Sequence, residues 1–172
     1  ARFSYQLNPS DFWAPINVRL ESGDRFEFNY VPWYEYLPQP FEIAKGVTLP
    51  VGGYNFTRFR GEFETSSHRW WEFGTTTWFG TFYDGRLLQQ ENYLRFTDRT
   101  GRWQAGVSSD QNFGTLKEGS FVLRLMQLNL TYAYNPNVVW TNFLQYDTES
   151  QNIGNNMRLR WTLKPGNDLF LV

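Results

Sequence analysis

Basic side chains two and four positions apart occupy one face of the segment 155–164. Side chains on a β-strand change face at every residue, so Arg158, Arg160 and Lys164 point to the same side. A basic stripe of this kind can select anionic solutes in a pore, as charged rings do in channels. It can equally neutralise acidic groups on neighbouring strands, such as Asp147 and Glu149. Both interpretations follow from the pattern.

Two carboxylates, Glu62 and Glu64, also share one face of a predicted strand. Paired carboxylates carry out glycoside hydrolysis, but Arg58 and Arg60 lie on the same face here. Residues two positions apart on a strand are separated by about 7 Å, which suits compensation between opposite charges. We therefore expect a ladder of mixed charges, and we predict no enzymatic activity.

His68, the only histidine, lies in a predicted turn directly after Ser66 and Ser67. It could belong to a serine hydrolase, but a catalytic triad is defined by geometry and not by neighbouring positions in the sequence. A solvated turn residue is the simpler interpretation. The chain has no cysteine, and it has neither an acidic calcium loop nor a phosphate-binding glycine motif. We therefore predict no metal site and no cofactor.

The aromatic content is high for a polar chain. Aromatic residues make up 20% of it, with eight tryptophans, although the mean hydropathy is −0.56. Tryptophan and tyrosine among polar residues are typical of the aromatic girdles of outer-membrane barrels, and carbohydrate-binding sandwiches are the alternative. No apolar run is long enough for a transmembrane helix, and a net charge of −1 predicts no nucleic-acid partner. We assign seven aromatic residues near strand ends to the membrane interface: Trp70, Trp71, Trp78, Tyr132, Tyr134, Trp140 and Trp161.

The elements that position these residues are about ten β-strands. Alternating runs separated by glycine, proline and asparagine cover the chain from the segment 2–7 onward, and several have ten or more residues. Ordinary strands have about 5–6 residues, whereas about 9–11 tilted residues cross a bilayer. Tight turns alternate with longer predicted loops, an asymmetry typical of outer-membrane barrels. The tight turns lie at 22–24, 135–137 and 165–167, and the longer loops at 32–54, 109–119 and 148–154.

The two faces of these strands distinguish a soluble from a membrane protein. In the segment 155–164, Met157, Leu159, Trp161 and Leu163 lie opposite the basic stripe. In a soluble sandwich such an apolar face lines the core, whereas in a membrane barrel it contacts lipid and the polar face lines a wet lumen. Strand length, loop asymmetry and aromatic placement together predict an all-β, antiparallel, up-and-down transmembrane β-barrel. Its predicted lumen-facing polar ladder consists of Arg58, Arg60, Glu62, Glu64, Gln127, Asn129, Arg158, Arg160 and Lys164.

Several motifs, in order along nearly the whole chain, carry a resemblance to a known family. The most specific run is NFLQYD at 142–147, RLRW at 158–161 and PGNDLFLV at 165–172. Shorter matches are GDR at 23–25, PFEI at 40–43, LPVGGYNF at 49–56, FYDGR at 82–86 and EGSF at 118–121. The chain resembles the C-terminal barrel region of a bacterial outer-membrane β-barrel family of unknown function, in which the barrel commonly follows a family-9-type carbohydrate-binding module.

The resemblance implies that residues 1–172 form the C-terminal portion of a larger barrel in the outer membrane of a bacterial cell, with a closing strand beyond Val172. The lipid bilayer is then the principal partner, and other envelope or surface proteins are further candidates. The leading functional hypothesis is a pore or transporter-like barrel, with saccharide-related solutes suggested by the family's domain architecture alone. The alternatives are a membrane anchor or scaffold for an upstream binding module or surface partner, acting through the loops 32–54 and 109–119; a barrel enzyme; and a soluble carbohydrate-binding β-sandwich.

Overall fold

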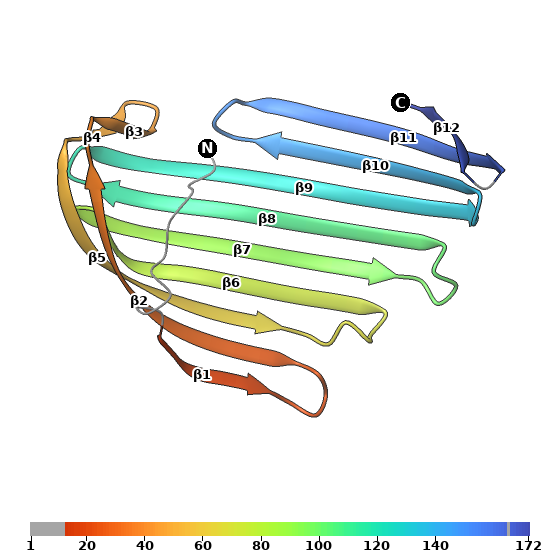
Figure 1. Cartoon of the computed structure of the whole chain (residues 1–172), viewed down its shortest axis with the longest axis horizontal. Helices are drawn as coiled ribbons and strands as arrows, with labels where there is room; N and C mark the ends of the chain where they lie inside the picture. The colour runs from red at the N-terminus through yellow and green to blue at the C-terminus, as the bar shows by residue number, and fades with distance from the viewer. Residues whose placement is uncertain (1–12, 165) are drawn as a thin grey trace.

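β-Strands dominate the structure, a computed structural model that describes residues 13–164 and 166–172 (Figure 1). Ten strands form one antiparallel sheet, and two more form a separate hairpin. The sheet strands are β1 (Trp13–Arg19), β2 (Arg25–Leu37), β5 (Gly52–Glu64), β6 (Trp71–Phe82), β7 (Gly85–Thr97), β8 (Trp103–Leu116), β9 (Gly119–Asn135), β10 (Val138–Asp147), β11 (Asn152–Lys164) and β12 (Asn167–Leu171). The hairpin strands are β3 (Phe41–Ala44) and β4 (Val47–Leu49). The prediction of an all-β, antiparallel, up-and-down architecture is confirmed.

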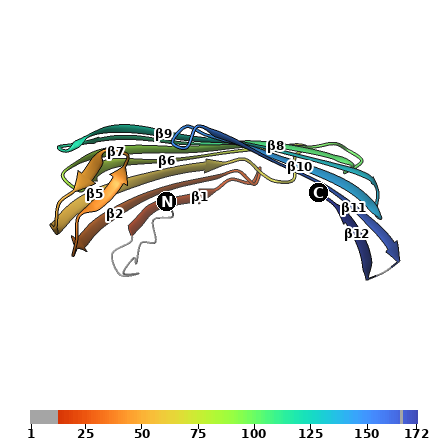
Figure 2. The same ribbon diagram turned by 90° about the horizontal axis from the view of Figure 1, so that it is seen from above.

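The main sheet is bent into an open arch (Figure 2). Its strands are adjacent in chain order, except that the β3–β4 hairpin intervenes in the sequence between β2 and β5. Within the described residues, β1 and β12 each pair on one side only, so the sheet is not closed into a barrel. The strand predicted at 2–7 lies outside the described residues.

The two faces of the arch differ in polarity, because apolar and polar residues alternate along most strands. On one face Glu27, Arg58 and Glu62 are at most 6% exposed, as expected where side chains converge inside a curved sheet. On the other face apolar side chains are open to the surroundings, with Val107 51% and Met126 47% exposed. We call these faces the concave polar face and the convex apolar face.

The connections lie at two ends of the arch, which we call the hairpin end and the turn end. At the hairpin end the strands are joined by residues 38–51, 83–84 and 117–118, and residues 148–151 join β10 to β11 on the same side but short of that end, since Asp147 pairs with Leu125. At the turn end they are joined by residues 20–24, 65–70, 98–102 and 136–137 and by the link from β11 to β12. The predicted contrast between tight turns and long loops is therefore wrong, because only 38–51 is long.

Strand residues replace much of the three predicted loops. β2 continues to Leu37 through Pro32, whose missing N–H is tolerated because β2 has a single described neighbour beyond the Trp13–Tyr30 pair. β8 continues to Leu116, so the predicted loop 109–119 is almost wholly strand. Residues 108–112 are polar on both faces and therefore show no alternation from which a strand could be predicted.

The β3–β4 hairpin folds over the concave polar face at the hairpin end. Its buried side chains join apolar residues at the ends of the sheet strands to form one core. The core consists of Leu37, Ile43, Ala44, Val47, Leu49, Phe56, Phe82, Tyr83, Leu87 and Leu116. Leu49 is completely buried, and the Glu42 carboxylate accepts a hydrogen bond of 2.9 Å from the Gly46 N–H in the hairpin turn. One end of the concave face is therefore covered.

Asp24 ties two neighbouring turns together at the turn end. Its carboxylate accepts hydrogen bonds of 2.6 and 3.0 Å from the Arg69 guanidinium, 2.8 Å from the Ser66 N–H and 2.8 Å from the Ser22 hydroxyl. These bonds, led by that from Arg69, hold the pKa of Asp24 well below its usual range. The charged carboxylate thus fixes the β1–β2 turn against the β5–β6 turn.

Candidate functional site: the concave polar face

A network of ion pairs joins β2 and β5 on the concave polar face. Arg25 and Arg60 lie between three glutamates: Arg25 pairs with Glu27 and lies 3.5 Å from Glu62, and Arg60 pairs with Glu62 and lies 3.4 Å from Glu27. Glu64 lies 4.0 Å from Arg25. The two carboxylates that could have formed a hydrolytic pair are thus engaged by guanidinium groups. The network compensates charge and stiffens this wall.

Arg58 lies on the same face, next to the hairpin core. Its side chain is 4% exposed, donates a hydrogen bond of 2.9 Å to the Gln89 side chain and lies 5.2 Å from the centre of the Phe82 ring. A charge this deeply buried requires polar partners, and the amide oxygen of Gln89 is one of them. Arg58 therefore belongs to the covered end of the face and Arg60 to its open part.

The middle of the concave face is acidic and amide-rich. Glu91 of β7 and Asp110 of β8 are cross-strand neighbours, and neither is within ion-pair distance of a cation in the described part of the chain. Next to them, Gln127 accepts a hydrogen bond of 3.0 Å from Ser108 and donates one of 3.4 Å to Gln145. Asn129 follows two residues after Gln127, opposite Gly106.

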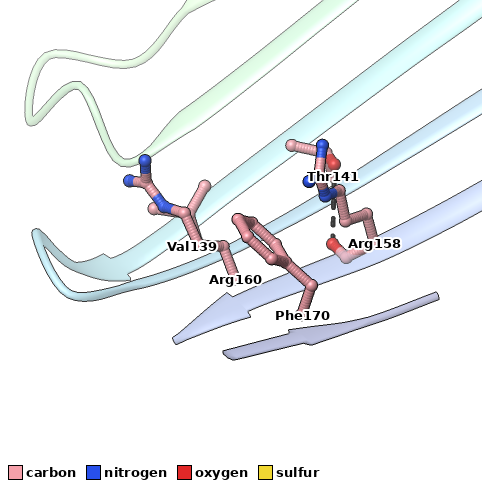
Figure 3. A pocket seen from close by; sticks show the side chains of 5 residues that line it. All are labelled: Val139, Thr141, Arg158, Arg160 and Phe170. Atoms are coloured by element: carbon pink, nitrogen blue, oxygen red, sulfur yellow. Dashed lines mark hydrogen bonds between the residues drawn. The ribbon is translucent and has the colours of Figure 1, made fainter. Parts of the chain in front are cut away.

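The basic stripe lies at the opposite edge of the arch, on β11. Arg158 and Arg160 pair in register with Thr141 and Val139, and with Phe170 they line a pocket of about 250 Å³ (Figure 3). Phe170 projects between the two arginines, and the Arg158 guanidinium lies 4.0 Å from the centre of its ring. Lys164 is exposed at the end of β11. Among the described residues, no ion pair forms between these three cations and Asp147 or Glu149.

The strand register contradicts the prediction that Trp78 lies at the membrane interface. Trp78 pairs with Arg60 and Gln89, and the Arg60 guanidinium lies 5.8 Å from its ring centre, so Trp78 lies on the concave polar face. The error arises because three consecutive threonines precede Trp78, so the pattern of this stretch assigns no face.

The other predicted interface aromatics gather near the turn end, with Trp71, Tyr132, Trp140 and Trp161 in convex register positions. Trp70 packs against Phe96 at a centroid distance of 5.9 Å, and Trp103 packs against Tyr132 at 4.3 Å. Phe96 and Trp103 were missed by sequence reasoning. Tyr134 is 63% exposed beside the β9–β10 turn. Together these rings form a belt across β6 to β11, which we call the turn-end belt; its members are Trp70, Trp71, Phe96, Trp103, Tyr132, Tyr134, Trp140 and Trp161.

His68 is an exposed residue of the turn at 65–70, where its N–H donates a hydrogen bond of 3.4 Å to the Ser66 hydroxyl. In residues 13–164 and 166–172, no group of three or more histidine, cysteine, aspartate or glutamate side chains is placed to hold a metal ion. The same residues contain no helix long and apolar enough to cross a membrane.

Comparisons with known proteins add no family assignment. No family model matches the chain, and no match was found among curated proteins or solved structures. The motif resemblance to an outer-membrane family stays a prediction.

Proposed function

We propose that the chain is the C-terminal part of an outer-membrane β-barrel whose concave polar face lines an aqueous passage for small polar solutes, with saccharide-related solutes as the candidate class. The observation that carries this proposal is the exposure of the convex apolar face. Side chains such as Ile153, Met157 and Leu163 are 72%, 55% and 58% exposed. Soluble monomers rarely expose apolar patches larger than about 300–600 Å², whereas lipid covers such a surface.

The dimensions of the convex face support this proposal. On β9, ten residues separate Tyr132 in the turn-end belt from Val122 near the hairpin end. At about 3.3 Å per residue this is about 33 Å along the strand, or about 25 Å along the membrane normal for a strand tilted by about 40°. An apolar band of about 25 Å between aromatic girdles is typical of outer-membrane barrels.

The concave polar face supports a passage because it separates charges of opposite sign. Glu91 and Asp110 lie on the middle strands, and Arg158 and Arg160 lie near the β12 edge. When further strands close the arch, acidic and basic walls border one lumen. Charged and hydrogen-bonding groups that line a pore select solutes by size and charge.

Membrane insertion is tested by fractionation and by heat-modifiable migration in detergent gels. We expect the protein in the outer-membrane fraction and a faster-migrating folded form in unheated samples. A protein that stays in solution without detergent would refute the proposal, because the convex face would then be buried by protein.

The passage itself is tested by single-channel conductance in planar bilayers. Reversing two charges with R158E and R160E together is expected to shift the reversal potential towards cation selectivity. The matched control reverses Arg99 and Arg102, which are exposed in the turn at 98–102, away from the concave face. An unchanged selectivity in R158E/R160E would show that solutes do not pass the basic stripe.

A membrane anchor is the second candidate, and the β3–β4 hairpin favours it. The hairpin core covers one end of the concave face, so a hairpin that never undocks could leave the barrel silent. Membrane insertion without any conductance would select the anchor over the passage.

A further inference from the structure

A compact polar patch interrupts the convex apolar face. Two adjacent rows of polar side chains cross the middle strands in register. The first row is Thr77, Gln90, Gln111 and Arg124 on β6 to β9, and the second is Thr75, Asn92 and Ser109 on β6 to β8. We call these seven residues the convex polar patch. Three strand spacings make it about 14 Å wide.

Apolar side chains border the patch at both ends. Phe79, Leu88 and Val122, which are 40–50% exposed, lie towards the hairpin end, and Leu94 and Val107 lie towards the turn end. The patch therefore lies inside the band that lipid contacts under the proposed function, on which this inference rests. It is nearer the hairpin end, because eight residues separate Arg124 from Tyr132 and two separate it from Val122.

The hydrogen bonds within the patch leave much of its capacity unused. The Thr75 hydroxyl donates to Asn92 at 2.8 Å, and the Gln111 amide donates to Ser109 at 3.1 Å. In the part of the chain that the structure describes, the Gln90 side chain has no hydrogen bond, and the Arg124 guanidinium has no hydrogen bond or ion pair and lies 5.8 Å from the centre of the Phe113 ring. Lipid tails offer no partner to such groups, so a protein surface is the expected cover.

We infer that the convex polar patch is a self-association surface and that a second copy of this chain covers it. A copy inserted in the same direction carries the same polar groups at the same depth. A two-fold axis parallel to the membrane normal and passing between β7 and β8 places the convex polar patch of one copy against that of the other. Two-fold symmetry is the usual symmetry of homodimers. Gln90, Asn92 and Gln111 then lie nearest the axis, and each amide can both donate and accept.

Charge placement agrees with a two-fold arrangement. Arg124 is at the outer end of its row, about 7 Å from an axis between β7 and β8 at a strand spacing of about 4.8 Å. The two guanidinium groups therefore lie on opposite sides of the axis, near amide and hydroxyl acceptors of the other copy. Polar contacts of this kind favour association in lipid, where apolar burial gives no preference for protein over lipid tails.

Single-cysteine crosslinking in isolated outer membranes tests the surface, because the chain has no cysteine of its own. S109C and Q90C, beside the axis, are expected to give a disulfide-linked dimer of the full chain after oxidation with copper phenanthroline. N155C is the matched control, a polar position on the convex face of β11. The double variant Q90L/Q111L is expected to raise the dimer dissociation constant in mild detergent about 10- to 100-fold. The control N142L/N155L leaves it unchanged, because Asn142 and Asn155 are hydrogen-bonded to each other on the convex face of β10 and β11, outside the patch.

The outcomes separate this inference from the proposed function. A heat-modifiable, membrane-inserted protein that is monomeric in mild detergent and gives no crosslink at 90 or 109 overturns the self-association surface alone. Equal crosslinking at 155 shows that the self-association surface does not lie at the convex polar patch. A stoichiometric complex with a different protein at the patch overturns the inference that a second copy of this chain covers it. A protein found outside the membrane overturns the proposed function and the inference together.

Discussion

Undocking of the β3–β4 hairpin by L49A is the most direct test of how the concave polar face is covered. Leu49 is completely buried and belongs to the core that holds the hairpin against the sheet strands. Replacing a buried leucine with alanine lowers the stability of the packing that contains it by about 3 kcal/mol, within a range of about 2–5. At 1.4 kcal/mol for each factor of ten, this raises the undocked fraction of the hairpin about 100-fold.

Hydrogen exchange measured on detergent-solubilised protein reports that fraction. We expect amides of residues 41–49 to exchange about 100-fold faster in L49A, because local undocking exposes them without unfolding the sheet. Amides of β8 and β9 away from the hairpin should keep their protection. T48A is the matched control, since Thr48 is on the same strand but exposed.

Two results would refute this reasoning. Unchanged exchange at 41–49 in L49A would mean that the core does not hold the hairpin. An equal acceleration throughout β8 and β9 would mean that hairpin and sheet unfold as one unit, so that the hairpin cannot act as a separate cover. Under the proposed passage, L49A should also show longer or more frequent open events in planar bilayers than T48A.

Three further changes test other parts of the structure. D24N should weaken the turn end at neutral pH, because it removes the carboxylate charge that Arg69 binds. In the unmodified protein, Arg69 lowers the folded-state pKa of Asp24, so the stabilisation from its carboxylate is complete above the ordinary pKa of 3.8 and is lost as the pH falls below that value. Thermal unfolding against pH checks this, and equal acid sensitivity in D24N would contradict it. E62Q should lower the free energy of unfolding in urea by about 2 kcal/mol, because it removes the charge of a buried carboxylate that Arg25 and Arg60 engage, and a loss under about 1 kcal/mol would place Glu62 in the class of exposed ion pairs. G74A should destabilise the sheet by about 1–3 kcal/mol, because a Cβ there overlaps the Tyr93 ring; near-neutral urea unfolding would contradict that packing.

The architecture could be predicted wherever one face of a strand is apolar and the other polar. The segment 155–164 alternates strictly, and the structure places a strand there as β11. Residues 108–112 have polar side chains on both faces, and their strand became visible only through pairing with β7 and β9. The period-two pattern measures a difference in surroundings between two faces, so it disappears where both faces are polar.

The candidate site was harder to predict because its members meet through strand register. Glu91 and Asp110 are adjacent across two strands but far apart in sequence, and no local motif links them. The charges within one strand, such as Arg60 and Glu62, needed no register and could be grouped from spacing alone. Trp78 shows the limit of that approach, since its face depends on pairing with Arg60.

On the concave polar face, two glycines leave room for aromatic rings of the next strand to lie over their backbone. A Cβ at Gly74 would overlap the ring of Tyr93, and one at Gly114 would overlap the ring of Phe121, so both rings lie flat across a neighbouring strand. The Tyr93 hydroxyl donates a hydrogen bond of 3.0 Å to Glu72, which fixes its ring along the wall. Rings that cover glycine backbone in this way protect the strand while occupying little of the space above it. Most of the buried apolar side chains on this face belong to the hairpin core, so hairpin docking rather than the wall residues is expected to govern access to the concave face.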